Sequence, residues 1–170
     1  MERVEILDYQ PQFKRYFKSL NLEWLQKYFK VEDEDQIFLS DPYGIIIKSG
    51  GSVIFARLDG KIVGTTALLK HDKQTFELTK MAVTKKAQGR QVGRKLTLAA
   101  IERAKTKGAK RLVLLTSPKL TAAYNLYRSL GFEEVSGSQP WATSYIRGGI
   151  PMSLKLKSRN HKNQKRRSYG

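Results

Sequence analysis

Residues 76–132 read FELTKMAVTKKAQGRQVGRKLTLAAIERAKTKGAKRLVLLTSPKLTAAYNLYRSLGF. The start of this stretch, residues 77–83, has the apolar and β-branched composition of a strand. A basic loop with two glycines follows and opens into residues 92–107, whose apolar side chains recur at helical spacing. Residues 111–115 predict a second strand, and residues 120–130 predict a short helix that stops before Gly131. This order of elements predicts a sheet with helices packed on it.

The loop between the first strand and the helix has the features of a site for a phosphorylated ligand. Its sequence, residues 88–94, is QGRQVGR. Backbone amides at the start of a helix point toward anions, and the helix dipole adds to the attraction. Arg90, Arg94 and Lys95 add positive charge. The spacing excludes the nucleotide-triphosphate loop, and the absence of Gly-x-Gly-x-x-Gly excludes the dinucleotide fingerprint.

The segments before this loop predict one strand, two short helices and a hairpin. Residues 3–7 alternate as a half-buried strand does. Residues 12–29 carry apolar residues at helical spacing, and we place a break near residues 19–21, with Asn21 as the N-cap of the second helix. Asp59-Gly60 is a strong two-residue turn between the strands predicted at residues 52–58 and 62–69.

After the loop stretch, residues 132–135 and 153–157 predict closing strands. The fold class predicted from these elements is α/β, of the α+β type. It has a mixed, mostly antiparallel sheet of six to seven strands flanked by about four helices. We place one domain at residues 1–157, followed by a basic, disordered tail at residues 158–170.

Composition limits the classes of protein that the chain can belong to. Its 170 residues are 40% hydrophobic and 28% charged, which is typical of a globular domain. No apolar run approaches the roughly 20 residues that span a bilayer, and the amino terminus lacks the apolar region of a signal peptide. There is no cysteine, and His71 and His161 are the only histidines. We therefore predict a cytoplasmic protein with no membrane association, no disulfides and no metal site.

The net charge of +17 predicts anionic partners. Five of the basic residues lie in the last twelve positions, so the body of the protein is basic as well. Nucleotides, nucleic acids and acidic surfaces all fit this charge. A basic face that contacts only solvent fits it equally well.

The quoted stretch resembles the GCN5-related N-acetyltransferases (GNAT family). Their acyl-coenzyme A loop has the pattern Gln/Arg-x-x-Gly-x-Gly/Ala, in which Gln88 matches the first position and Gly93 the last. Gln91 replaces the middle glycine. We expect this replacement to be tolerated if Gln91 is right-handed, and to cost roughly 1 kcal/mol if its φ is positive. The family pattern Ala-x-x-Leu-Tyr-x-x-Leu-Gly-Phe matches residues 123–132.

The resemblance implies an acetyltransferase fold and direct transfer of an acetyl group from acetyl-CoA to a primary amine of a small molecule or peptide. It implies that Tyr127 is the acid that protonates the departing thiolate, and that Glu77 is the general base. Packing is the alternative role for Tyr127, and exposure to solvent the alternative for Glu77. The residues that the resemblance assigns to the cofactor are Met81, Ala82, Val83, Gln88, Gly89, Arg90, Gln91, Val92, Gly93, Arg94 and Asn125.

Several assignments stay open at the level of sequence. Trp24, Tyr28 and Trp141 are candidates for lining an acceptor pocket, and each also fits a role in the core. The asparagine that the family usually has after the strand at residues 111–115 is replaced near Thr116. A second function is a nucleic-acid or ribosome-associated protein, including one that acetylates aminoacyl-tRNA, with the basic tail binding phosphates. A homodimer is a further expectation.

Overall fold

The computed structural model describes residues 3–142 and 149–157. The tail predicted at residues 158–170 lies outside the described residues. The described part contains a sheet of strands β1 (Val4–Asp8), β2 (Ser52–Leu58), β3 (Lys61–Lys70), β4 (Thr75–Val83), β5 (Arg111–Thr116), β6 (Glu133–Glu134) and β7 (Ile150–Lys155). Its α-helices are α1 (Lys14–Tyr28), α2 (Asp33–Ser40), α3 (Val92–Thr106) and α4 (Thr121–Ser129).

The seven strands form one sheet in the order β1-β2-β3-β4-β5-β7-β6. Neighbouring strands are antiparallel except β4 and β5, which are parallel. This is the mixed, mostly antiparallel sheet predicted from the sequence. The Asp59-Gly60 hairpin is also confirmed, because both residues have a positive φ (50° and 78°) and the flanking strands pair.

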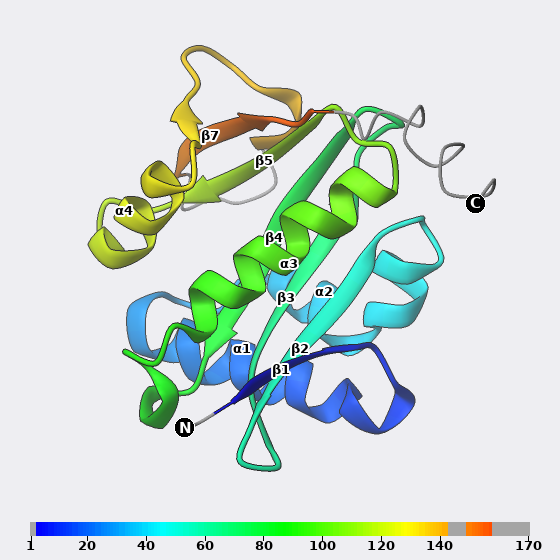
Figure 1. Cartoon of the computed structure of the whole chain (residues 1–170), viewed down its shortest axis with the longest axis vertical. Helices are drawn as coiled ribbons and strands as arrows, with labels where there is room; N and C mark the ends of the chain where they lie inside the picture. The colour runs from blue at the N-terminus through cyan, green and yellow to red at the C-terminus, as the bar shows by residue number, and fades with distance from the viewer. Residues whose placement is uncertain (1–2, 143–148, 158–170) are drawn as a thin grey trace, which may run out of the picture.

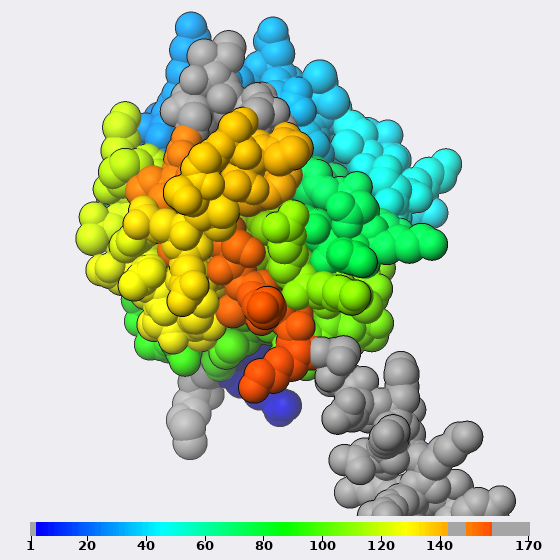
Figure 2. Space-filling model, turned by 90° about the horizontal axis from the view of Figure 1, so that it is seen from above, coloured from blue at the N-terminus to red at the C-terminus, as the bar shows by residue number. Residues whose placement is uncertain are grey.

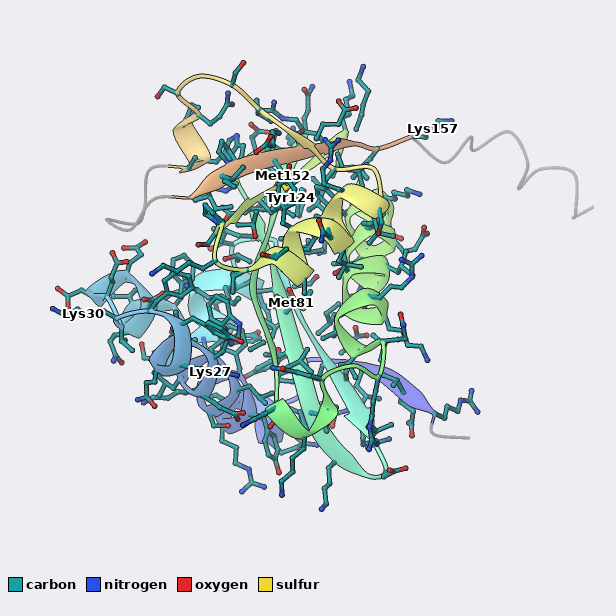
Figure 3. All side chains as sticks on the ribbon, turned by 90° about the vertical axis from the view of Figure 1, so that its left-hand side faces the viewer. Lys27, Lys30, Met81, Tyr124, Met152 and Lys157 are labelled. Carbon is teal, nitrogen blue, oxygen red and sulfur yellow. The ribbon has the colours of Figure 1, made fainter. Side chains whose placement is uncertain are left out.

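Helices cover the two faces of the sheet separately. Helix α3 lies on one face, and α1 and α2 lie on the other (Figure 1). The side view shows the same division, with Lys27 marking the last turn of α1 and Lys30 the chain just after it (Figure 3). The core under α3 includes Leu96 and Ala100, and Gly64 of β3 allows this helix to approach closely. A Cβ at Gly64 would lie 2.9 Å from Val92 Cγ1. The core under α1 and α2 includes Phe17 and Leu39.

The helical prediction for residues 12–29 was wrong in one respect. Helix α1 runs unbroken through residues 19–21, and Asn21 is buried inside it rather than capping a second helix. Its Nδ2 donates a hydrogen bond of 2.8 Å to the carbonyl oxygen of Phe17, one turn earlier. Because the helix backbone itself satisfies this amide, the asparagine does not end the helix.

Two further helical segments were not predicted from the sequence. Helix α2 begins with a capping box, in which the amide of Glu32 donates to Asp35 Oδ2 at 2.9 Å. A π-helical turn, η2 (Tyr43–Ile47), follows it. Both segments lie on the face of the sheet that α1 covers. No helix in the described ranges combines the length and apolar character needed to cross a membrane.

Candidate active site

Strand β4 contains a bulge in the middle of the sheet. Its pairing with β3 shifts register between Ala67–Thr79 and Thr65–Ala82, so β4 carries one extra residue. Lys80 lies at this point with a φ of 55°. Its Nζ lies 3.0 Å from Asp35 Oδ1, and both side chains are buried. The bulge is therefore joined to α2 by a buried ion pair.

Strands β4 and β5 pair over a short length and then separate. Thr75, Phe76 and Glu77 pair with residues 111–113, and no further pair joins the two strands in the described residues. Beyond that point β5 continues to Thr116 beside β7, while β4 continues through the bulge. Figure 1 shows the two strands diverging from the end at which they meet. The separation opens the sheet between two of its own strands.

A cavity of about 410 Å³ lies where these strands separate. Five elements or connections line it. These are α1 (Asn21, Trp24, Leu25 and the adjoining Phe29), β4 (Glu77, Leu78, Thr79, Lys80, Met81), β5 and the loop after it (Leu115, Thr116, Ser117, Pro118, Leu120), α4 (Ala123, Tyr127) and the start of β7 (Gly149, Ile150). Its walls are largely apolar, so the few polar groups facing it determine what chemistry it can support.

Glu77 brings a carboxylate into this cavity from β4. Its side chain is 8% exposed, and its Oε1 lies 2.7 Å from His71 Nε2. The alternative in which Glu77 faces open solvent is therefore wrong. His71 was not a site candidate, because it belongs to the loop between β3 and β4 and no motif marks it.

Tyr127 brings a phenol into the same cavity from α4. The residue is 7% exposed and its ring packs edge-on against Phe132, with centroids 5.7 Å apart. Burial raises the pKa of the Tyr127 phenol to about 12, because the phenolate loses its hydration. The phenol is therefore fully protonated near neutral pH and is available as a hydrogen-bond or proton donor. The edge-on contact with Phe132 supports the packing role, and the proton-donor role stays a prediction.

The loop before α3 adopts the conformation in which a glycine is favoured at position 91. Gln91 is the N-cap of α3 and is left-handed, with φ 66° and ψ 13°. The second of the two expectations for Gln91 therefore applies, and its side chain costs roughly 1 kcal/mol relative to glycine. Gly89 also has a positive φ, of 80°.

The same loop presents backbone amides that the helix cannot use. The first bond of α3 runs from the amide of Lys95 to the carbonyl of Gln91, so the amides of residues 91–94 have no acceptor within the helix. Gln88, Arg90 and Arg94 are exposed beside them. A Cβ at Gly93 would lie 4.0 Å from Leu126 Cδ2 of α4. The loop thus adjoins the helix that carries Tyr127.

The remaining predicted residues fall in several places. Met81 lines the cavity, whereas Ala82 and Val83 are buried or half-buried in β4 beyond it. Asn125 is exposed on α4. Of the three aromatic candidates for the acceptor pocket, Trp24 lines the cavity, and Tyr28 and Trp141 do not.

Asn21 and Phe29 also line the cavity, and neither was named as a site residue from the sequence. Thr116 lies at or next to the position where the resemblance leads us to expect an asparagine, and its Oγ1 is buried at the cavity without a hydrogen-bond partner among the described residues. No group of three or more His, Cys, Asp or Glu side chains in the described ranges could hold a metal ion.

Comparison with known proteins identifies the architecture. The family model for the acetyltransferase (GNAT) family matches residues 13–132. The N-acetylaspartate synthetase of Mus musculus is 30% identical over 123 residues, which are 72% of this chain and 38% of that protein. The chain therefore spans less than two fifths of the length of this relative.

Solved structures show the same fold. An acetyltransferase of the GNAT family from Staphylococcus aureus superposes with a TM-score of 0.82 at 25% identity, covering 91% of this chain and all of that one. The YncA protein of Salmonella typhimurium, solved with its cofactor acetyl-CoA, superposes with a TM-score of 0.72 at 19% identity. The shared region covers 92% of this chain and 96% of YncA.

Proposed function

The chain belongs to the acetyltransferase (GNAT) family, and we propose that it transfers the acetyl group of acetyl-CoA directly to a primary amine of a small molecule or peptide. One observation carries this proposal: Glu77 of β4 and Tyr127 of α4 line the same cavity. Amine acylation requires a group that removes a proton from the amine and a group that supplies one to the leaving thiolate. The cavity offers one of each.

The loop before α3 is the proposed site for the cofactor diphosphate. The amides of residues 91–94 are without helical acceptors, and Arg94 and Lys95 are exposed next to them. Main-chain donors at a helix start, joined by cationic side chains, suit phosphate groups. The YncA structure, which contains acetyl-CoA, shares this fold. Bound here, acetyl-CoA supplies the thioester that the amine attacks.

The backbone of β4 is the proposed site for the pantetheine arm. Beyond Glu77 the side of β4 that faces β5 has no strand partner in the described residues. Main-chain groups of Met81, Ala82 and Val83 therefore hydrogen-bond an extended ligand as an added strand would. Asn125, exposed on α4, is the proposed side-chain contact on the opposite side of that arm.

In the proposed reaction Glu77 accepts the proton of the amine and Tyr127 donates a proton to the thiolate. The Tyr127 phenol carries its proton at neutral pH, since burial raises its pKa to about 12, and the same shift favours the return of a proton from water after the donation. The Glu77 carboxylate is buried and hydrogen-bonded to His71 Nε2, which holds it in one position. The aromatic walls formed by Trp24 and Phe29 surround the acceptor.

The acceptor itself is proposed only as a class. N-acetylaspartate synthetase, named for a product with an acetylated amino group, makes L-aspartate one probe. Phenylethylamine suits the aromatic walls, and spermidine, a lysine-containing peptide and an aminoacyl-tRNA cover other amines. No finding here supports the alternative role in nucleic-acid binding. A cytoplasmic location and a homodimer also remain predictions.

Calorimetric titration of the full chain with acetyl-CoA tests the cofactor assignment. We expect saturable binding to one site per chain, and no binding at millimolar acetyl-CoA would remove the enzymatic proposal. Thiol release from acetyl-CoA is then measured with each of the five probes. At least one amine should accelerate release above hydrolysis, with an acetylated product visible by mass spectrometry.

A further inference from the structure

His71 and Glu77 form a pair that connects the cavity with the outside of the protein. Glu77 Oε1 and His71 Nε2 are 2.7 Å apart. The carboxylate is 8% exposed and lines the cavity, whereas the imidazole side chain is 27% exposed. The β3–β4 loop that carries His71 lies at the surface of the molecule, where its green atoms are visible from above (Figure 2). One member of the pair thus faces the cavity and the other reaches water.

Hydrogen bonds hold the two partners in this arrangement. The amides of His71 and Asp72 donate to the carbonyl of Thr75 at 3.0 and 3.3 Å. Asp72 Oδ1 accepts from the amides of Gln74 and Thr75, both at 2.8 Å. Glu77 itself lies in the middle of the sheet, paired with Leu69 of β3 and Val113 of β5. Hydrogen bonds therefore fix both the loop that carries His71 and the strand that carries Glu77.

Among the charged groups near His71, Glu77 is the carboxylate that contacts its ring. Asp72 is occupied by its own loop: the hydrogen bonds from Gln74 and Thr75 lower the pKa of this carboxyl, with smaller contributions from Arg111 and His71. Arg111 of β5 donates from Nε to Thr75 Oγ1 at 3.0 Å. Lys70 and Lys73 are exposed on the same connection.

We propose that His71 positions the Glu77 carboxylate by donating a hydrogen bond from Nε2–H to Oε1. This inference rests on the proposed acetyl transfer. As the amine nitrogen bonds to the acetyl carbon and the carbon–sulfur bond breaks, the amine proton passes to the other oxygen of Glu77, while Nε2–H keeps its bond to Oε1. Tyr127 gives its proton to the thiolate. Glu77 then releases a proton to water and the Tyr127 phenolate takes one from water, so both groups return to their starting forms.

Kinetics of three variants test this role, with the fastest amine of the five probes as acceptor. His71→Ala should lower kcat by roughly 10- to 100-fold, within the range that general acid–base groups contribute. Acetyl-CoA affinity should stay within about twofold, because the pair does not contact the loop before α3. Imidazole added to His71→Ala should restore part of the lost kcat. Lys73→Ala, an exposed change in the same loop, is the matched control and should leave kcat unchanged.

His71→Gln is the conservative variant, and it tests the inference even if His71→Ala folds poorly. The glutamine amide still donates a hydrogen bond to Glu77. We expect this variant to keep its fold and most of the parent kcat. A kcat in His71→Gln as low as in His71→Ala, parent-like kcat in His71→Ala, or a loss that imidazole leaves untouched would each overturn the inference.

Nitrogen NMR of the imidazole rings gives a readout that does not depend on turnover. The chain has only two histidines, so the ring signals of His71 are assigned by comparison with His71→Gln. Glu77→Gln should shift them, and Lys73→Ala should not. If the ring signals of His71 do not shift in Glu77→Gln, His71 and Glu77 do not interact in solution. If the parent chain fails to bind acetyl-CoA, the proposed function fails instead; if it binds and acetylates while His71 is dispensable, only this inference fails.

Discussion

The segment from β4 to α4 and the segment from α1 to η2 contribute to the same cavity in different ways. The first acts largely through its main chain: a bulge at Lys80, a separation of β4 from β5 and a left-handed loop before α3. The second acts through side chains, with Asn21, Trp24 and Leu25 on the cavity wall. We infer that donor binding depends on backbone conformation, whereas acceptor choice can change by substitution in α1 without altering the sheet.

The buried Asp35–Lys80 pair joins these two segments, and breaking it has the largest expected effect. Asp35→Ala leaves the Lys80 ammonium buried without this carboxylate, which typically costs about 3–5 kcal/mol. Urea denaturation should show this loss in the free energy of unfolding. The double variant Asp35→Leu/Lys80→Met should recover the part that comes from the unpaired ammonium, whereas both variants lose the capping bond from the Glu32 amide to Asp35. Gln36→Ala, exposed in the same helix, is the control. If Asp35→Ala lowers the free energy of unfolding by less than about 1 kcal/mol, the pair does not couple the two segments.

Removing the Tyr127 hydroxyl tests the part of the site that acts through a side chain in the β4–α4 segment. Tyr127→Phe should lower kcat by about 100-fold while acetyl-CoA affinity changes little. In the parent protein the phenol has a pKa of about 12, so deprotonation of Tyr127 should not lower kcat until the pH approaches that value. Steady-state kinetics and calorimetry check both statements. Tyr124→Phe, one turn earlier on α4, should turn over normally. If Tyr127→Phe has the same kcat as the parent protein, Tyr127 serves in packing and not in proton donation.

A branched side chain at Gly93 tests the main-chain site directly. A Cβ there would meet only Leu126 Cδ2, at 4.0 Å, so the protein should remain folded. Gly93→Val should nevertheless raise the Kd for acetyl-CoA by about tenfold or more, equal to about 1.4 kcal/mol, because the side chain crowds the amides. Calorimetry measures the change. Leu98→Val places a β-branched residue on the exposed face of the same helix and should bind normally. If Gly93→Val binds acetyl-CoA with unchanged affinity, the loop before α3 is not the cofactor site.

The smallest expected effect comes from relieving the loop. Gln91→Gly should raise the free energy of unfolding by about 0.5–1 kcal/mol, because glycine adopts a positive φ without steric cost. Gln88→Gly is the matched control, since Gln88 has φ −65° and gains nothing from glycine. Thermal and urea denaturation should therefore show a higher free energy of unfolding for Gln91→Gly than for Gln88→Gly. Equal destabilisation of both would show that Gln91 is not strained.

The segment with fixed backbone conformations was the one that the sequence predicted well. Turn residues such as Gly60, Gly89 and Gly131 occupy positions with positive φ, and such positions leave a direct mark on composition. The strand–loop–helix order around residues 88–94 was equally visible. The destabilisation that Gln91 causes at a positive φ could also be anticipated, although the sequence did not show which φ it adopts.

Contacts between distant residues could not be predicted in the same way. Asn21 is a cap by local preference, whereas in the structure it is buried inside α1 and bonded to the Phe17 carbonyl. The bulge at Lys80 depends on Asp35, which is 45 residues away in sequence. The partner of Glu77 is a loop histidine that no pattern singles out. Pairings of this kind depend on the assembled sheet.

The short pairing between β4 and β5 also bears on stability. Past Glu77 the main-chain groups of β4 that face β5 pair with no strand among the described residues, so the sheet has an internal gap there. If the pantetheine arm binds there as proposed, it adds hydrogen bonds to the sheet as well as delivering the thioester. Its arrival should slow hydrogen–deuterium exchange through residues 79–83 and raise the melting temperature in proportion to occupancy.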